Sequence, residues 1–66
     1  MSLTTLEKNL ACIYYGNSRE DTVAQLREGL PHITEPDTLA AAHTAIAKLD
    51  SMSDMEFTLS FRGVML

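Results

Sequence analysis

Apolar residues recur at helical spacing in three separate stretches of this 66-residue chain. Within each stretch they are three, four and three residues apart, a rhythm that places them along one face of an α-helix. The stretches contain Leu3, Leu6, Leu10 and Ile13, then Val23, Leu26, Leu30 and Ile33, then Leu39, Ala42, Ile46 and Leu49. The pattern therefore predicts three helices, each burying one face, with Leu30 and Ile33 packing from a loop beyond a short second helix.

Four start signals accompany these stretches. A Ser or Thr oxygen can accept a hydrogen bond from the first turn of a helix, and an acid three residues later can return it. Such pairs are Thr4 with Glu7, Ser18 with Asp21, Thr34 with Asp37, and Ser53 with Glu56. At the other ends, Gly16 and Gly29 are expected to adopt the left-handed conformation that stops a helix.

The last predicted helix is the least regular. Phe57, Leu59 and Phe61 alternate as residues of a strand would, but the chain offers no second strand to pair with them. Met52, before the Ser53 cap, can instead pack on Phe57 at the helix start. We therefore expect an all-α fold, a small bundle of three main helices plus a short C-terminal fourth helix, with roughly antiparallel neighbours. The single domain covers 1–66, with helices near 5–15, 19–29, 36–50 and 54–62.

Charge and composition limit the class of partner and compartment. The net charge is −4, and the five basic residues are spread along the chain. This arrangement disfavours strong binding to nucleic acid or to an anionic membrane, because both need clustered positive charge. Cys12 is the only cysteine, so no internal disulfide can form, and no targeting or membrane-spanning segment is evident. We expect a cytoplasmic protein.

The reactive side chains do not form a recognisable catalytic set. Cys12 falls late in the first helix among apolar residues, where a half-buried packing role is expected. His32 and His43 are eleven residues apart and lack the spacing that places two imidazoles on one helix face. We therefore expect no catalytic residues, no metal site and no cofactor, and an enzyme is the last of the functional classes considered.

Aromatic and apolar residues near both ends are the candidate contacts for a partner. Tyr14 and Tyr15 are adjacent on a helix, so at most one can point fully inward, and the other is left at the surface. The tail adds further apolar side chains of the kind enriched in interfaces. These tail residues are Phe61, Val64, Met65 and Leu66. A tail folded back onto the bundle is the alternative.

A helix-turn-helix motif is an alternative interpretation of the second and third predicted helices. The link GLPHITEP between the second and third helices is longer than the turn of that motif. The outward positions of the third helix also offer few groups that could read base edges. Direct nucleic-acid binding is thus not expected.

Two stretches resemble a known family. The first holds an Asn-Leu-x-Cys-Ile-Tyr core and a Ser-Arg helix start, at Asn9, Leu10, Cys12, Ile13, Tyr14, Ser18 and Arg19. The second is a Lys-Leu-x-x-Met-Ser-Asp-x-Glu-Phe segment, at Lys48, Leu49, Met52, Ser53, Asp54, Glu56 and Phe57. Together, over roughly residues 5 to 58, they resemble the transposon-transfer assisting protein family, small helical proteins of conjugative transposons in Gram-positive bacteria.

The resemblance implies a role in the transfer of a mobile element and supplies no catalytic or ligand residues. Arg19 is a further candidate contact for a partner, because a cation at a helix start opposes the helix dipole and suggests a compensating contact. We expect a non-enzymatic accessory protein that acts through a protein partner of the conjugation or regulatory machinery, and self-association stays open. The alternatives are a small DNA-binding regulator or recombination-directionality factor, and an acidic protein that imitates DNA.

Overall fold

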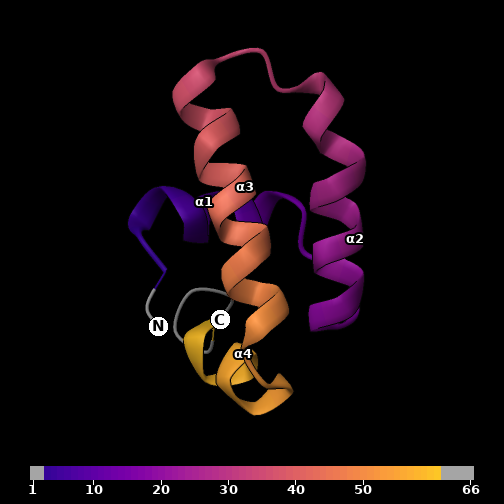
Figure 1. Ribbon diagram of the computed structural model, residues 1–66. Coiled ribbons are helices and arrows are strands. Elements are labelled where there is room, and N and C mark those ends of the chain that lie inside the picture. Colours follow the sequence, from indigo (N-terminus) through magenta and orange to yellow (C-terminus); the bar gives the residue numbers. More distant parts are fainter. Residues whose placement is uncertain (1–2, 62–66) are drawn as a thin grey trace.

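The computed structural model describes residues 3–61, and all its regular structure is helical (Figure 1). The helices follow in the order α1 (Thr5–Ile13), α2 (Arg19–Gly29), the 3-10 turn η1 (Leu30–His32), α3 (Pro36–Ser51) and α4 (Asp54–Phe61). No strand occurs within the described range, so the predicted all-α class with a short fourth helix is confirmed. α1 ends two residues earlier than predicted, and the predicted last residue of α4, at position 62, lies outside the described range.

The helices surround α3, which runs through the middle of the molecule (Figure 1). α2 lies beside α3 and runs in the opposite direction, whereas α1 crosses behind α3 at a steep angle and α4 lies beneath the C-terminal end of α3. α3 packs against both α1 and α2. The predicted antiparallel arrangement therefore holds for α2 and α3 and not for α1.

One core joins the elements. Its buried members are Leu3, Leu10, Ala11, Val23, Leu26, Ala42, Ile46, Leu49, Met52, Phe57 and Phe61. Leu30 and Ile33 pack against this cluster from η1 and the loop after it, as predicted from the second stretch of apolar residues. Met52 and Phe57 are both buried in it, in keeping with a contact that spans the start of α4.

The buried face predicted for the first stretch of apolar residues is partly wrong. Leu6 is exposed, and Ile13 is 73% exposed, although both were assigned to the buried face. The face that α1 buries instead passes through Leu3, Glu7 and Leu10, because α1 lies across α3 and presents a face rotated from the predicted one. A carboxylate in the middle of that face hides it from a search for apolar spacing.

Three of the four helix starts are confirmed. At α1, Thr4 and Glu7 form a complete capping box, and at α4 Ser53 and Glu56 exchange the same two hydrogen bonds. At α2 the Ser18 hydroxyl accepts from the Asp21 N–H at 3.1 Å.

The fourth start, at Thr34, is wrong. α3 begins one residue later than that cap requires, after Glu35, whose side chain makes no capping bond. Pro36 explains the shift, since a proline disfavours helical conformation in the residue before it and itself fits the first helical position.

The expected left-handed glycines are also wrong, because no glycine in the described range has a positive φ. Gly29 is helical and buried, and a Cβ added to it would lie 2.5 Å from Cε1 of Tyr14. A Cβ on Gly16 would lie 2.1 Å from Oδ2 of Asp21. At both positions a larger residue would therefore force the neighbouring side chain to move.

Candidate functional site

Three of the four predicted contact residues within the described range gather near α4. Tyr15 follows α1, Arg19 begins α2, and Phe61 ends α4. A shallow hollow of about 300 Å³ opens here, lined by Tyr15, Asn17, Ser18, Arg19, Asp54, Phe57 and Thr58. The remaining predicted contacts, Val64, Met65 and Leu66, lie outside the described residues.

Three aromatic rings connect the end of α1 to α4. The Tyr15 ring stacks on Phe57, with centroids 5.4 Å apart and planes 14° from parallel, and it meets Phe61 edge-on at 5.8 Å. Phe61 is only 2% exposed, so it offers no surface to a partner in this conformation. Tyr15 covers the two phenylalanines while keeping part of its own ring in solvent.

Tyr14 turns the other way and packs against the core, with its ring over Gly29. The two tyrosines therefore diverge, with Tyr14 the more buried of the pair, although both follow the end of α1 and do not lie on the helix as predicted. Tyr14 joins α1 to the end of α2, and its half-buried ring is mainly a packing element.

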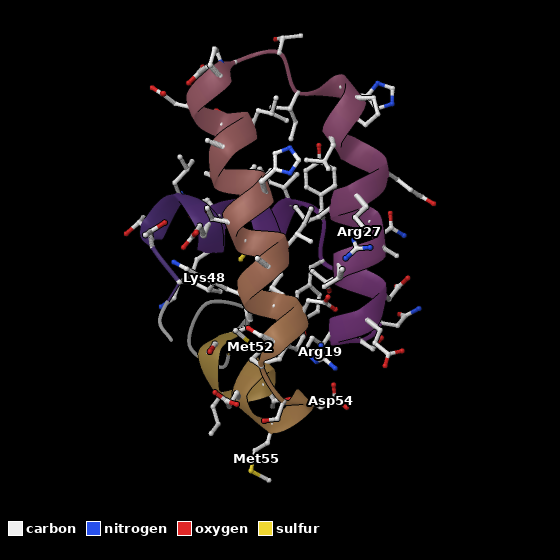
Figure 2. The ribbon with its side chains drawn as sticks, viewed as in Figure 1. Arg19, Arg27, Lys48, Met52, Asp54 and Met55 are labelled. Atoms are coloured by element: carbon white, nitrogen blue, oxygen red, sulfur yellow. The ribbon has the colours of Figure 1, made fainter. Side chains whose placement is uncertain are left out.

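Arg19 makes the compensating contact that its position suggested, and the contact lies within the protein. Its Nε donates to Oδ1 of Asp54 at 3.0 Å, and its Nη1 donates to the carbonyl oxygen of Leu49 at 3.0 Å. A second carbonyl, that of Asp50, lies 3.3 Å from Nη1. These carbonyls belong to the last turn of α3, where a cation is favoured by the helix dipole. Arg19 thus links the start of α2 to the end of α3 and to α4 (Figure 2).

Glu7 is a buried carboxylate, whereas the sequence pattern predicts only a capping role for it. Its side chain is 3% exposed and accepts from Lys48 Nζ at 2.8 Å, from the Thr44 hydroxyl, and from the Thr4 N–H at 2.7 Å. Burial by itself raises the pKa of Glu7, but the hydrogen bonds from Lys48, Thr4 and Thr44 together outweigh it and lower the pKa to about 2. The sequence does contain one indication that Glu7 is buried, because Leu3, Glu7 and Leu10 are four and three residues apart and so share one helix face.

Ion pairing involves most of the basic residues. Arg19 pairs with Asp54, Lys48 with Glu7, and Arg27 lies 3.6 Å from Asp50. These are three of the five Lys and Arg residues of the chain. Positive charge that is neutralised in this way contributes little to the attraction of phosphate groups.

The cysteine and the two histidines lie on three different elements of the fold. Cys12 is half-buried against the core, and His32 and His43 are exposed on η1 and α3. Within residues 3–61, no group of three or more His, Cys, Asp or Glu side chains is placed to hold a metal ion. In the same range, no helix is both long and apolar enough to cross a membrane.

Four aliphatic or methionine side chains remain well exposed in two pairs, and neither pair was among the predicted contacts. Leu6 and Ile13 form one pair on α1, and Met55 and Leu59 form the other on α4. The α4 pair could have been found from the sequence, because side chains at 55, 57, 59 and 61 cannot all face one side of a helix.

Comparison with known protein families gives a match. A sequence model of the TTRAP family, described as transposon-transfer assisting protein, matches residues 3–60. This range includes both stretches on which the family resemblance rested, and the resemblance is confirmed. No curated protein and no solved structure matches the chain significantly.

Proposed function

Because this chain belongs to the transposon-transfer assisting protein family, we propose that it is a non-enzymatic accessory protein of a conjugative transposon and that it acts through protein contacts. Its partner is a DNA-processing, coupling or regulatory protein of the element, and the two meet in the cytoplasm. The family name supplies the role in transfer. The proposal that the protein acts through protein contacts rests on the side chains exposed at its surface.

The observation that carries this proposal is that charged side chains bond within the fold, whereas apolar side chains are left exposed. The charged groups of Glu7, Arg19 and Lys48 form hydrogen bonds to other helices of the protein and hold these helices together. The exposed surface keeps apolar side chains on α1 and α4. Exposed apolar groups on a small domain are typical of surfaces that bind other proteins.

The charge distribution weighs against the DNA-binding alternative. A regulator that reads DNA needs basic residues free to meet phosphates, and Arg19, Arg27 and Lys48 are paired with acids of the same chain. The exposed positions of α3 include Ala40, His43 and Ala47, which offer little to base edges. No observation on this surface favours DNA over protein.

Deletion of the gene from an element that carries it tests the proposed role. We expect fewer transconjugants per donor, restored by the gene in trans, while excision of the element, measured across the rejoined junction, is unchanged. An unchanged transfer frequency would remove the role in transfer. Loss of excision would instead favour a recombination-directionality factor.

A mobility shift with DNA from the element ends separates the remaining alternatives. We expect no specific complex at either of two salt concentrations. A complex that weakens steeply with salt would establish phosphate contacts and the DNA-binding alternative. Competition with DNA for a DNA-binding protein of the element would identify a DNA mimic.

A further inference from the structure

The outer face of α4 carries two exposed apolar side chains. Met55 is 73% exposed and Leu59 is 57% exposed, and their spacing of four residues places them side by side on the helix. Phe57 and Phe61 occupy the inner face of the same helix and are buried. In Figure 2 the Met55 side chain points away from the rest of the protein.

Acidic side chains lie on α4 and on the helix ends that meet it. Asp54 and Glu56 lie on α4 itself, Asp50 lies in the last turn of α3, and Glu20 and Asp21 lie in the first turn of α2. The Arg19 contacts show that these three helix ends meet. Arg19 is mostly buried, with 15% of its side chain exposed, and Arg27 faces Asp50. Among the described residues, the end of the molecule that holds α4 therefore carries more acidic than basic side chains, and Asp54 and Glu56 flank Met55 and Leu59 on α4 itself.

We propose that the outer face of α4, formed by Met55 and Leu59 and flanked by Asp54 and Glu56, binds a basic amphipathic helix of the partner protein. The proposal rests on the proposed function and specifies the chemistry of its partner. Apolar residues of the partner helix pack on Met55 and Leu59, as in helix-in-groove recognition, and its Lys or Arg residues face the acids. Methionine suits this role because its flexible thioether adapts to different apolar surfaces.

The acidic residues of α4 favour a basic helix over other binding partners. A second copy of the chain, docked face to face, would bring Asp54 and Glu56 toward the same acids of its mate, and such like-charge contacts oppose binding. An anionic membrane surface is repelled for the same reason.

The exposed pair on α1 provides a matched comparison. Leu6 and Ile13 are also exposed, but their neighbours on α1 are Lys8 and Asn9. That face therefore lacks the acids that a basic helix requires. A double substitution there changes the same amount of apolar character without touching the proposed site.

Binding is tested with designed helical peptides of about 18 residues, long enough to form a helix on contact. The probe carries a leucine stripe flanked by lysines, and its two controls have glutamates in place of the lysines or the same residues in scrambled order. Fluorescence anisotropy should show that only the basic amphipathic peptide binds the full chain. Met55→Gln with Leu59→Gln should weaken binding by about tenfold or more, whereas Leu6→Gln with Ile13→Gln should not.

Glu56 is tested with glutamine, because Glu56 also accepts from the Ser53 N–H in the capping box and glutamine can keep that bond. Removing this one charge should weaken binding about two- to fivefold, the range of an exposed charge pair. Equal binding of basic and acidic peptides, or equal loss with the α1 and α4 double variants, would overturn the proposal.

Methionine oxidation shows whether another occupant already covers the face. In the free chain, dilute peroxide should oxidise Met55 quickly and the buried Met52 slowly, and the basic peptide should protect Met55. Protection of Met55 in the free monomer would show that the chain covers its own face. Protection that grows with protein concentration would indicate a second copy, and either result would overturn the proposal.

The mating assay separates this inference from the function on which it rests. The chain with Met55→Gln and Leu59→Gln should fail to restore transfer to the deletion strain, and the α1 double variant should restore it. A photo-crosslinking residue at position 55 should label a basic amphipathic helix in donor cells, whereas one at position 13 should not. Full restoration by the α4 variant would refute the docking face while leaving the role in transfer intact.

Discussion

Lys48 Nζ donates to Oε1 of Glu7 at 2.8 Å, and this bond joins the last turn of α3 to the first turn of α1. Glu7 also caps its own helix through Thr4, so one carboxylate both starts α1 and anchors it across α3. Removing one partner of such a buried pair leaves an uncompensated charge, which costs more than the pair contributes. The orientation of α1 therefore depends on this contact.

Stability should depend on pH through Glu7. Its pKa is about 2 in the folded chain, against an ordinary value of 4.5. A carboxyl with a lowered pKa stabilises the fold fully above its unfolded pKa, and this contribution disappears as pH falls through the folded pKa. Between about pH 5 and pH 2 the free energy of unfolding should fall by about 3 kcal/mol on account of this group. Urea unfolding at stepped pH measures the change.

Two variants isolate that contribution. Glu7→Gln keeps the shape and loses the ionisable group, so the gap in stability between the wild type and this variant should close as pH falls. Lys48→Met removes a cation that lowers the pKa and should cost about 3 kcal/mol at neutral pH. Adding Glu7→Gln to Lys48→Met should recover part of that loss. Parallel pH curves for wild type and Glu7→Gln would contradict the assignment.

Arg19 should matter more to stability than the acid it pairs with. Its guanidinium also satisfies carbonyl oxygens at the end of α3, which a lysine cannot do with the same geometry. Arg19→Lys should cost about 1 to 2 kcal/mol, as expected for one or two lost hydrogen bonds. Asp54→Asn should cost less, since the Asp54 side chain is largely exposed. Thermal unfolding of both variants measures which one loses more stability. A larger loss of stability for Asp54→Asn than for Arg19→Lys would contradict this prediction.

Gly29→Ala should destabilise the protein although Gly29 is in a helical conformation. Alanine in place of glycine within a helix ordinarily gains about 0.5 to 1 kcal/mol. Here the added Cβ would lie 2.5 Å from the Tyr14 ring, which must move and lose its packing. In a Tyr14→Ala background the same substitution should become stabilising. A double-mutant cycle by urea unfolding measures this change of sign, and additive effects would show that the two residues do not interact.

The corrected face of α1 can be tested by substitution. Ile13→Gln and Leu6→Gln should each change stability by no more than about 0.5 kcal/mol, because both side chains are exposed. Leu10→Ala should cost about 2 to 5 kcal/mol, because Leu10 lies in the core. Comparable losses at Ile13 and Leu10 would restore the face predicted from the apolar rhythm.

The sequence by itself determined the helices. Their number, their class and three of their four starts follow from contacts between residues at most four positions apart, and such contacts can be seen in the order of the residues. The Thr4 and Ser53 caps and the position of Pro36 are local features of this kind. The two motif stretches also determined the family, which the match over residues 3–60 confirms.

The tertiary structure alone decided which faces are buried and which are left for a partner. The steep crossing of α1 exposes Ile13 and buries Glu7, because Lys48 and Thr44, far away in the chain, compensate the carboxylate there. The meeting of three helix ends at Arg19 likewise places α4 with Phe61 inward and Met55 outward. Spacing along the chain can define two faces of a helix, but only the neighbours that the fold brings together determine which face meets water.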